Sequence, residues 1–168
     1  AQPLIMGIVV SALMGMALTL PISSAAIGIS LGLSGIAAGA AAVGCCSQMV
    51  GFAVMSFREN RWNGLFSQGI GTSMLQMPNI IKNPLIWLPP IITSIVLGPI
   101  STCVLKMVNN ATGSGMGTAG LVGQFMGYQA MTESGVTPAV AILEMVLMHF
   151  IAPAVLSLVM CEGMRKLK

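Results

Sequence analysis

Two ionisable side chains, Glu144 and His149, lie inside a long apolar stretch, PAVAILEMVLMHFIAPAVLSLVM (138–160). Ionisable groups at membrane depth are energetically expensive and usually have a function, such as binding a solute or an ion. Five residues turn a helix by about 140°, so the two side chains lie on different faces and cannot form a local pair. Pro153 leaves the His149 carbonyl without its helical partner. This combination favours a site for a polar solute.

The alternative for these two residues stays open. Glu144 could instead pair with a side chain from another element, and His149 could make a polar packing contact. Glu133, in the turn TESG (132–135), is expected to face water.

Amide side chains form a second candidate set. Each amide carries a donor and an acceptor, so a cavity lined by amides with apolar walls suits a neutral polyol such as a sugar. The alternative is that these amides cap broken helices and satisfy freed backbone groups. The candidate solute-binding residues are therefore Glu144, His149, Gln76, Asn79, Asn83, Asn109, Asn110 and Gln124.

The sequence offers no self-contained set of catalytic residues. It has no Asp and one His, so no Ser–His–acid set can be assembled, and no Cys/His spacing indicates a metal site. The four Cys lie in or beside apolar runs and are expected to pack as small hydrophobic residues. GMGTAG (115–120) fits G-x-G-x-x-G, but it lacks the preceding strand and the acidic residue about 20 positions later that dinucleotide binding needs. We therefore expect no catalytic residue, no metal and no cofactor.

The composition indicates a membrane protein. Of the 168 residues, 55% are hydrophobic and 7% charged, with a mean hydropathy of +0.91. A soluble domain carries about a quarter charged residues, so these charges are too few to cover a surface in water. The basic residues are scattered or terminal, which does not indicate a nucleic-acid partner. The lipid bilayer is the expected surrounding.

Apolar runs and glycines predict an all-α integral membrane fold. Four kinked transmembrane helices are expected, together with two Gly-rich broken or re-entrant half-helices and one interfacial segment. The predicted spans are 3–20, a span ending at 57, 85–107 and 138–161; the Gly-rich segments are 25–38 and 109–131; the interfacial segment is 65–84.

Two Gly-rich segments resemble each other. Shifted by 88 positions, SLGLSGIAAG (30–39) lies over TAGLVGQFMG (118–127), and three glycines coincide. Transporters use repeats of this kind to build a site near the middle of the membrane. The sequence thus predicts a single membrane domain, 1–168, with repeats 3–57 and 85–161. Chance similarity between Gly-rich segments is the alternative.

The basic residues predict a topology. Arg58 and Arg61 form one cluster, and the tail forms another, and such clusters usually mark the cytoplasmic side. The segment 109–131 would then enter and leave from the outer side without crossing. Lys106 would lie outside, a mild exception to this bias.

Three stretches carry a family resemblance: ALTLPISSAAIGISLGLSGIAAGAAAVGCCSQMVGFAV (17–54), GIGTSMLQMPNIIKNPLIWLPP (69–90) and GMGTAGLVGQ (115–124). The chain resembles the EIIC membrane proteins of the bacterial phosphotransferase system, including those labelled toxin (perfringolysin) regulators. Known members are longer, which implies that this chain corresponds to the C-terminal half of one. The resemblance implies a multi-pass sugar permease, usually a homodimer, in the bacterial inner membrane.

The resemblance also implies how a site would work. In better-understood EIIC families a Glu and a His contact the sugar hydroxyl that is phosphorylated, but those motifs do not align residue by residue here. Any phosphoryl donor would be a separate EIIB partner, because Cys45 and Cys46 lie in apolar sequence. We expect a permease component that binds a small polar solute. At most, it would be a transport subunit coupled to sugar phosphorylation by the separate EIIB partner. The alternatives are a membrane sensor that controls toxin gene expression without net transport, and a structural half whose site lies elsewhere.

Overall fold

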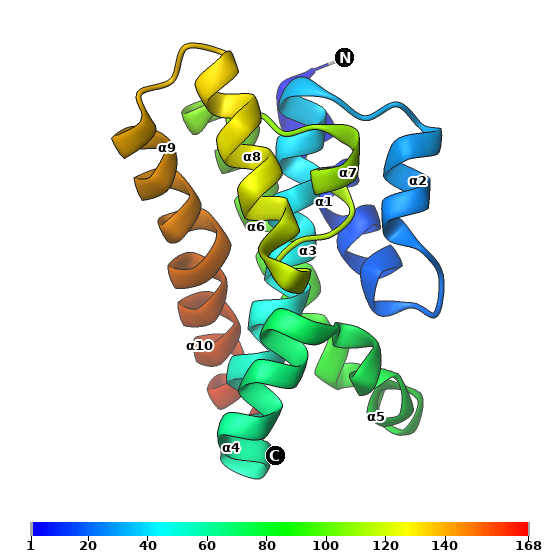
Figure 1. Ribbon diagram of the computed structural model, residues 1–168. Helices are drawn as coiled ribbons and strands as arrows, with labels where there is room; N and C mark the ends of the chain where they lie inside the picture. Colours follow the sequence, from blue (N-terminus) through cyan, green and yellow to red (C-terminus); the bar gives the residue numbers. More distant parts are fainter. Residues whose placement is uncertain (1, 168) are drawn as a thin grey trace.

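The computed structural model describes residues 2–167, and within this range the chain is built from helices with no β-strand (Figure 1). Three helical runs are long and apolar enough to cross a membrane: α3 (Gly35–Met55), Pro84–Leu105 and Pro138–Lys166. The second run contains α6 (Leu88–Pro99), and the third contains α9 (Pro138–Met145) and α10 (Ala152–Lys166). A fourth apolar helix, α1 (Pro3–Thr19), has 17 residues and is shorter than the others. The all-α membrane fold is confirmed.

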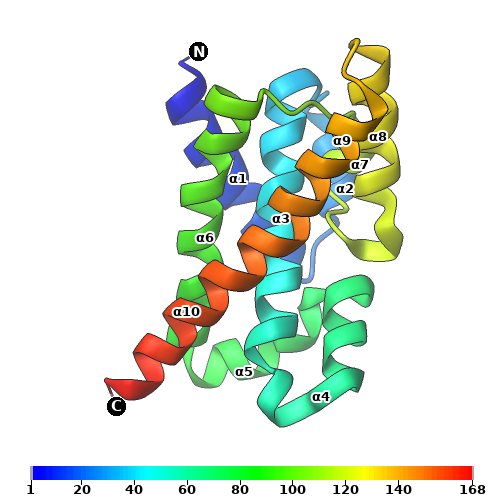
Figure 2. The ribbon, with the colours of Figure 1, turned by 90° about the vertical axis from the view of Figure 1, so that its left-hand side faces the viewer.

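Helix α3 is the central element of the bundle, and it packs against α1, α6 and α10 (Figure 2). Its middle is rich in Ala and Gly, and most of its side chains are fully buried. Gly44 lies so close to α1 that a Cβ atom there would collide with the Ser11 carbonyl group. Ser11 in turn donates a hydrogen bond to the Ser94 carbonyl on α6, at 2.7 Å. Small residues thus let three helices approach closely, as expected where lipid provides no hydrophobic drive between helices.

Prolines change the helical pitch at the expected places. A π-helical turn, Ile100–Leu105, follows Pro99, and another, Val146–Ile151, ends just before Pro153. Pro153 cannot donate to the carbonyl four residues earlier, and that carbonyl lies inside the second turn, where the wider pitch redistributes the backbone bonds. The second π-helical turn contains His149. The last run also reaches Lys166 rather than stopping at 161.

Each Gly-rich segment forms a short helix and a sharp break. Helix α2 (Ser24–Ser30) precedes a break at Gly32, and α7 (Ala111–Ser114) precedes one at Gly120; both glycines have a φ near +60°, where other residues are strained. The two short helices pack on each other, and Ser24 Oγ donates to the Gly115 carbonyl at 2.6 Å. Gly32 and Gly120 are aligned by the 88-residue shift. The repeat itself stays a prediction.

The second Gly-rich segment runs from Asn109 through α7 to α8 (Val122–Glu133) and turns back on itself (Figure 1). Its two ends lie together, because Asn109 and Glu133 line one cavity. A segment whose ends meet on one side of the molecule does not cross it. The re-entrant path predicted for 109–131 agrees with this arrangement.

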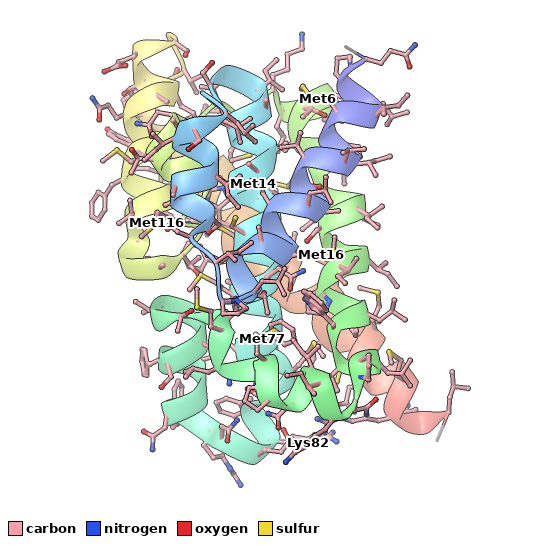
Figure 3. All side chains as sticks on the ribbon, turned by 90° about the vertical axis from the view of Figure 1, so that its right-hand side faces the viewer. Met6, Met14, Met16, Met77, Lys82 and Met116 are labelled. Atoms are coloured by element: carbon pink, nitrogen blue, oxygen red, sulfur yellow. The ribbon has the colours of Figure 1, made fainter. Side chains whose placement is uncertain are left out.

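The predicted interfacial segment forms short helices at one end of the bundle. It follows α4 (Phe57–Phe66) and comprises a π-helical turn (Ser67–Gly71), a 3₁₀ turn (Ser73–Gln76) and α5 (Met77–Lys82). Lys82 lies at the end of the molecule opposite Met6 (Figure 3). Helix α4 and the end of α10 lie there too (Figure 2). We call this the charged end, defined by Arg58, Glu59, Arg61, Lys82, Glu162, Arg165 and Lys166.

Candidate functional site

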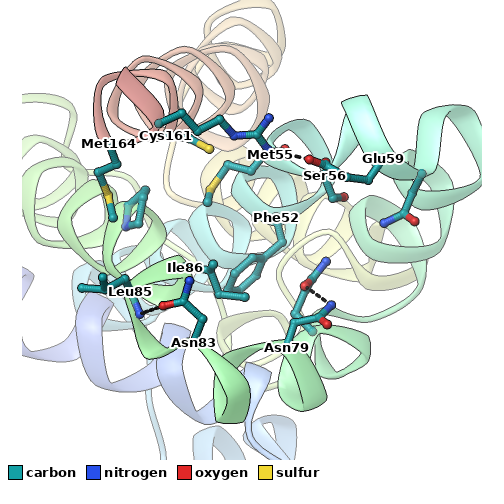
Figure 4. Close-up of a pocket in the computed structure, with 14 residues that line it drawn as sticks. Phe52, Met55, Ser56, Glu59, Asn79, Asn83, Leu85, Ile86, Cys161 and Met164 are labelled. Atoms are coloured by element: carbon teal, nitrogen blue, oxygen red, sulfur yellow. Dashed lines mark hydrogen bonds and ion pairs between the residues drawn. The ribbon is translucent and has the colours of Figure 1, made fainter. Parts of the chain in front are cut away.

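A cavity of about 510 Å³ opens at the charged end. Its volume lies within the range of about 300–1,000 Å³ that small-molecule sites occupy. The cavity is formed by the end of α3, α4, the interfacial helices, the 3₁₀ turn Pro84–Trp87 with the start of α6, and α10 (Figure 4). Its apolar wall consists of Phe52, Met55, Leu85, Ile86, Pro89, Cys161 and Met164, and its polar wall of Ser56, Glu59, Asn60, Gln76, Asn79, Asn83 and Arg165.

Three amides form a hydrogen-bonded chain, and two of them, Gln76 and Asn79, belong to the polar wall. Gln76 Nε2 donates to Gln68 Oε1 at 2.8 Å, and Asn79 Nδ2 donates to Gln76 Oε1 at 3.1 Å. Gln68 and Gln76 are buried, whereas Asn79 is exposed at the cavity. Because Gln76 and Asn79 are three residues apart across the start of α5, they fall on one face. The chain therefore holds its polar atoms in fixed positions beside an apolar wall.

Asn83 lies beside this chain and begins the next helical turn. Its Oδ1 accepts a hydrogen bond from the Leu85 backbone N–H at 3.3 Å, so the side chain caps the turn. Within residues 2–167, no hydrogen bond engages Asn83 Nδ2 or Asn79 Oδ1. One donor and one acceptor on the cavity wall are thus available to a solute.

An ion pair forms the rim of the cavity. Arg165 Nη2 lies 2.9 Å from Glu59 Oε1, and the same nitrogen donates to the Met55 carbonyl at 3.2 Å. A second pair joins the same two helices, with Arg58 Nη2 at 3.1 Å from Glu162 Oε2. Glu59 and Arg165 line the cavity, whereas Arg58 and Glu162 do not.

A second set of polar side chains lies in the interior, between α3, α8 and the π-helical turn Val146–Ile151. Gln124 Nε2 lies 2.9 Å from His149 Nδ1 and 3.4 Å from Cys46 Sγ. An amide NH₂ group can only donate, so Nδ1 accepts and the neutral ring carries its proton on Nε2. Gln124 Oε1 is buried and has no partner within residues 2–167. The structure thus brings two predicted residues, Gln124 and His149, into direct contact.

Asn109 and Asn110 hold the re-entrant segment in place. Asn109 Nδ2 donates to the Gly123 carbonyl at 3.0 Å, and its Oδ1 accepts from the Asn110 N–H at 2.8 Å. Asn110 Oδ1 accepts from the Gly113 N–H at 2.9 Å and caps α7. These contacts match the capping alternative for this pair. Both residues also line a second cavity of about 410 Å³, at the end of the molecule opposite the charged end.

Glu144 lies apart from the other candidates. It is partly buried on α9, and no hydrogen bond or ion pair reaches it from residues 2–167. It lines neither cavity. As the helical spacing predicts, it does not contact His149, which turns toward Gln124.

The phosphotransferase-system EIIC family matches the whole chain, residues 1–168. The chain belongs to the phosphotransferase-system EIIC family. It is therefore a membrane transport component of the phosphotransferase-system type. Comparison with curated proteins and with solved structures gives no match.

In this EIIC chain, the structure adds polar residues that were absent from the predicted set. Gln68 links Gln76 to Ser56, whose Oγ lies 3.5 Å from Gln68 Oε1. Gln48 is fully buried on α3, and its Oε1 accepts from Thr19 at 3.2 Å and from the Trp87 indole N–H at 2.9 Å. Gln48 is an amide inside an uncharged apolar span, and this contrast alone could have marked it as a residue that makes polar contacts between helices.

Cys46 was predicted to be a small buried hydrophobic residue, and it is fully buried. It also accepts a weak hydrogen bond from Gln124, which the sequence did not indicate. Within the described residues, no group of three His, Cys, Asp or Glu side chains is arranged to hold a metal.

Proposed function

We propose that this EIIC chain binds a neutral sugar in the cavity at the charged end, as the solute-binding part of a phosphotransferase-type permease. The observation that carries the proposal is the hydrogen-bonded pair Gln76 and Asn79 on the wall of a 510 Å³ cavity, held from behind by the buried Gln68. Sugars present many hydroxyls that both donate and accept, and amides complement both roles. The Phe52 side chain, which lines the same cavity, supplies the apolar surface that sugar C–H faces need.

The orientation follows from charge. The charged end carries five basic residues, Arg58, Arg61, Lys82, Arg165 and Lys166, whereas Lys106 lies beyond the far end of the α6 run. Cytoplasmic segments are enriched in Lys and Arg, so the charged end faces the cytoplasm of a multi-pass inner-membrane protein. The cavity then opens toward the compartment where an EIIB-type phosphoryl donor would reach the bound sugar.

The other predicted residues are proposed to serve the path between the two cavities. Gln124 lies at the start of α8 and His149 in the middle of the run Pro138–Lys166, whereas Asn109 and Asn110 line the second cavity, opposite the charged end. The proton on His149 Nε2 and the orphaned Gln124 Oε1 give one donor and one acceptor that a passing hydroxyl could use. The Glu144 carboxylate has free acceptors at membrane depth. Solute would exchange between the ends when these interior contacts separate.

The test is uptake of labelled hexoses into proteoliposomes that contain the full-length protein, with and without a phosphorylated EIIB partner. Uptake that requires the phosphorylated partner supports the permease. Solute binding without uptake under both conditions favours the sensor that controls gene expression. If neither binding nor uptake occurs for any hexose tested, the sugar site is wrong. Cross-linking in the same vesicles tests the predicted homodimer.

A matched pair of variants tests the location. Gln76→Ala removes the middle of the amide chain, whereas Gln129→Ala removes an exposed amide on α8 that lines neither cavity. Binding that Gln76→Ala weakens and Gln129→Ala preserves would place the sugar at the charged end. Equal binding by both variants would place it elsewhere.

A further inference from the structure

A second group of polar side chains lies behind the wall of the cavity at the charged end. We call Thr19, Gln48, Ser73 and Trp87 the inner cluster. Gln48 Oε1 accepts two hydrogen bonds, one from Trp87 Nε1 at 2.9 Å and one from Thr19 Oγ1 at 3.2 Å. The Thr19 hydroxyl lies 3.0 Å from the Ser73 hydroxyl. Side chains from four elements, two of them 3₁₀ turns at the charged end, therefore meet around one fully buried amide.

One group of the inner cluster has no partner. An indole N–H can only donate, so the atom that faces Trp87 is the amide oxygen of Gln48, and this fixes the orientation of the amide. Gln48 Nε2 is then left over, buried and without a hydrogen bond within residues 2–167. A buried donor that lacks an acceptor is unfavourable in a protein interior. The position beside Nε2 therefore suits a ligand atom that accepts a hydrogen bond.

The inner cluster lies directly behind the cavity. Gln48 precedes Phe52 by four residues, so the two side chains lie on one face of α3. Ser73 precedes Gln76 by three residues in a 3₁₀ turn, where such side chains eclipse each other. Phe52 and Gln76 line the cavity, whereas Gln48 and Ser73 do not. Because the end of α3 forms the cavity, Gln48 lies one helical turn further from the charged end.

We infer that Gln48 Nε2 binds a hydroxyl oxygen of the solute at a second, inner position, which the solute reaches when the Phe52 ring rotates. The ring lines the cavity and has open space into which it can turn (Figure 4). The inner cluster contains no charged side chain and its free group is a donor, so a neutral hydroxyl fits and a cation does not. The inference rests on the proposed function, because it assigns the next contact of the same sugar.

The experiment is a double-mutant cycle between Gln48 and the hydroxyls of the sugar, measured by binding to the full-length protein in nanodiscs. The probes are a hexose that the protein binds and its monodeoxy analogues. We expect one analogue to bind about threefold to tenfold more weakly than the hexose, the range for one hydrogen bond. Gln48→Met, which keeps the side-chain length without polar atoms, should bind that analogue and the hexose equally. Such coupling indicates a direct contact.

Thr19→Val is the matched control for a structural role of the inner cluster. It removes a hydroxyl that donates to Gln48 Oε1 and leaves Nε2 in place. Both variants should lower the thermal midpoint, but Thr19→Val should still discriminate against the deoxy analogue. If both variants lose this discrimination together, the inner cluster serves the fold alone, and the inference is overturned.

Trp87 reports whether the solute reaches the inner cluster, because its indole N–H is bonded to the Gln48 amide. Trp62→Phe leaves Trp87 as the only tryptophan of the 168 residues, and any tryptophan outside them is replaced in the same way. In this background the hexose should shift the fluorescence emission of Trp87, and Gln48→Met should abolish the shift. A shift that survives in Gln48→Met would come from the cavity itself and would overturn the inference.

Phe52→Leu tests the route. A shorter side chain between the cavity and Gln48 should speed the shift of Trp87 emission after rapid mixing with the hexose, and an unchanged rate would overturn the rotation of Phe52. Hexose binding in which no analogue is coupled to Gln48 would overturn the inner position and leave the proposed sugar site intact. Failure of every sugar to bind would overturn the proposed function itself.

Discussion

The cavity at the charged end and the interior contact between Gln124 and His149 use similar side chains in different surroundings. In the cavity, Asn79 and Asn83 keep polar atoms free beside open space, and the amide chain is satisfied internally. In the interior, Gln124 and His149 depend on each other, and one amide oxygen has no partner within residues 2–167. An unmade hydrogen bond is cheap where solvent or solute can fill it and expensive where neither can. The cavity can thus exchange water for a solute, whereas the Gln124–His149 contact holds the interior closed.

The largest expected effect comes from the close packing of α3 against α1 in the interior. Gly44→Ala would place a Cβ against the Ser11 carbonyl and force α1 away from α3. The same change at Gly163, on α10 at the charged end, meets no neighbouring atom. We expect Gly44→Ala to lower the thermal midpoint in detergent strongly or to prevent folding, and Gly163→Ala to leave it unchanged or raised. Equal midpoints would mean that the two regions are packed alike.

The next effect is on the interior contact itself. Gln124→Leu removes the donor to His149 Nδ1 and leaves a buried nitrogen unpaired, at about 1–3 kcal/mol of stability. Gln129→Leu, on the exposed side of the same helix, is the matched control and should change stability by less than about 0.5 kcal/mol. Chemical denaturation of the two variants in parallel measures the difference. A Gln124 variant as stable as the control would contradict the closed interior.

A smaller effect on stability, but a clear one on binding, is expected at the cavity. Gln76→Ala should weaken hexose binding by about tenfold, because one good hydrogen bond contributes about 1 kcal/mol and the neighbouring amides lose their alignment. The thermal midpoint should fall less than in Gln124→Leu, since solvent reaches Asn79 at the open wall. Titration of ligand and thermal melts on the same samples separate the two quantities. A variant that melts early but binds normally would reverse the comparison between the two regions.

The smallest effect is expected at Glu144, which lies in neither region. Glu144→Gln should leave hexose binding at the charged end unchanged, because Glu144 does not line that cavity. Uptake should fall, since an unpaired carboxyl at membrane depth marks a path for a solute or an ion. Initial uptake rates and equilibrium binding, measured together, test both statements. Unchanged uptake would remove Glu144 from the proposed path.

Much of the fold could be predicted because its causes are local. Apolar length determines which segments can cross a membrane, and glycines and prolines mark where helices break. The break at Gly32 and the π-helical turn before Pro153 follow from such local chemistry. The boundaries moved by a few residues, most visibly at Lys166, because capping and packing decide where a helix ends.

The site could be predicted only in part, because the same amide can serve a solute or the backbone. From sequence alone, both alternatives were open for Asn79 and for Asn109. Tertiary contacts place Asn79 at an open cavity and bind Asn109 to Gly123. Nothing in the local sequence distinguishes them, since each choice depends on which distant element lies opposite.

By itself, the sequence of this EIIC chain determined the solvent it folds in, the helical runs, the breaks between them and a short set of polar candidates. Only the tertiary structure decided that Gln124 meets His149, that Glu59 on α4 meets Arg165 on α10, and that the predicted amides Gln76, Asn79 and Asn83 share a cavity wall. The physical reason is the distance along the sequence between the residues that interact. Helix formation and its interruption are set by neighbours within a turn or two, whereas a site is made by side chains that lie far apart in sequence and meet only when the helices pack.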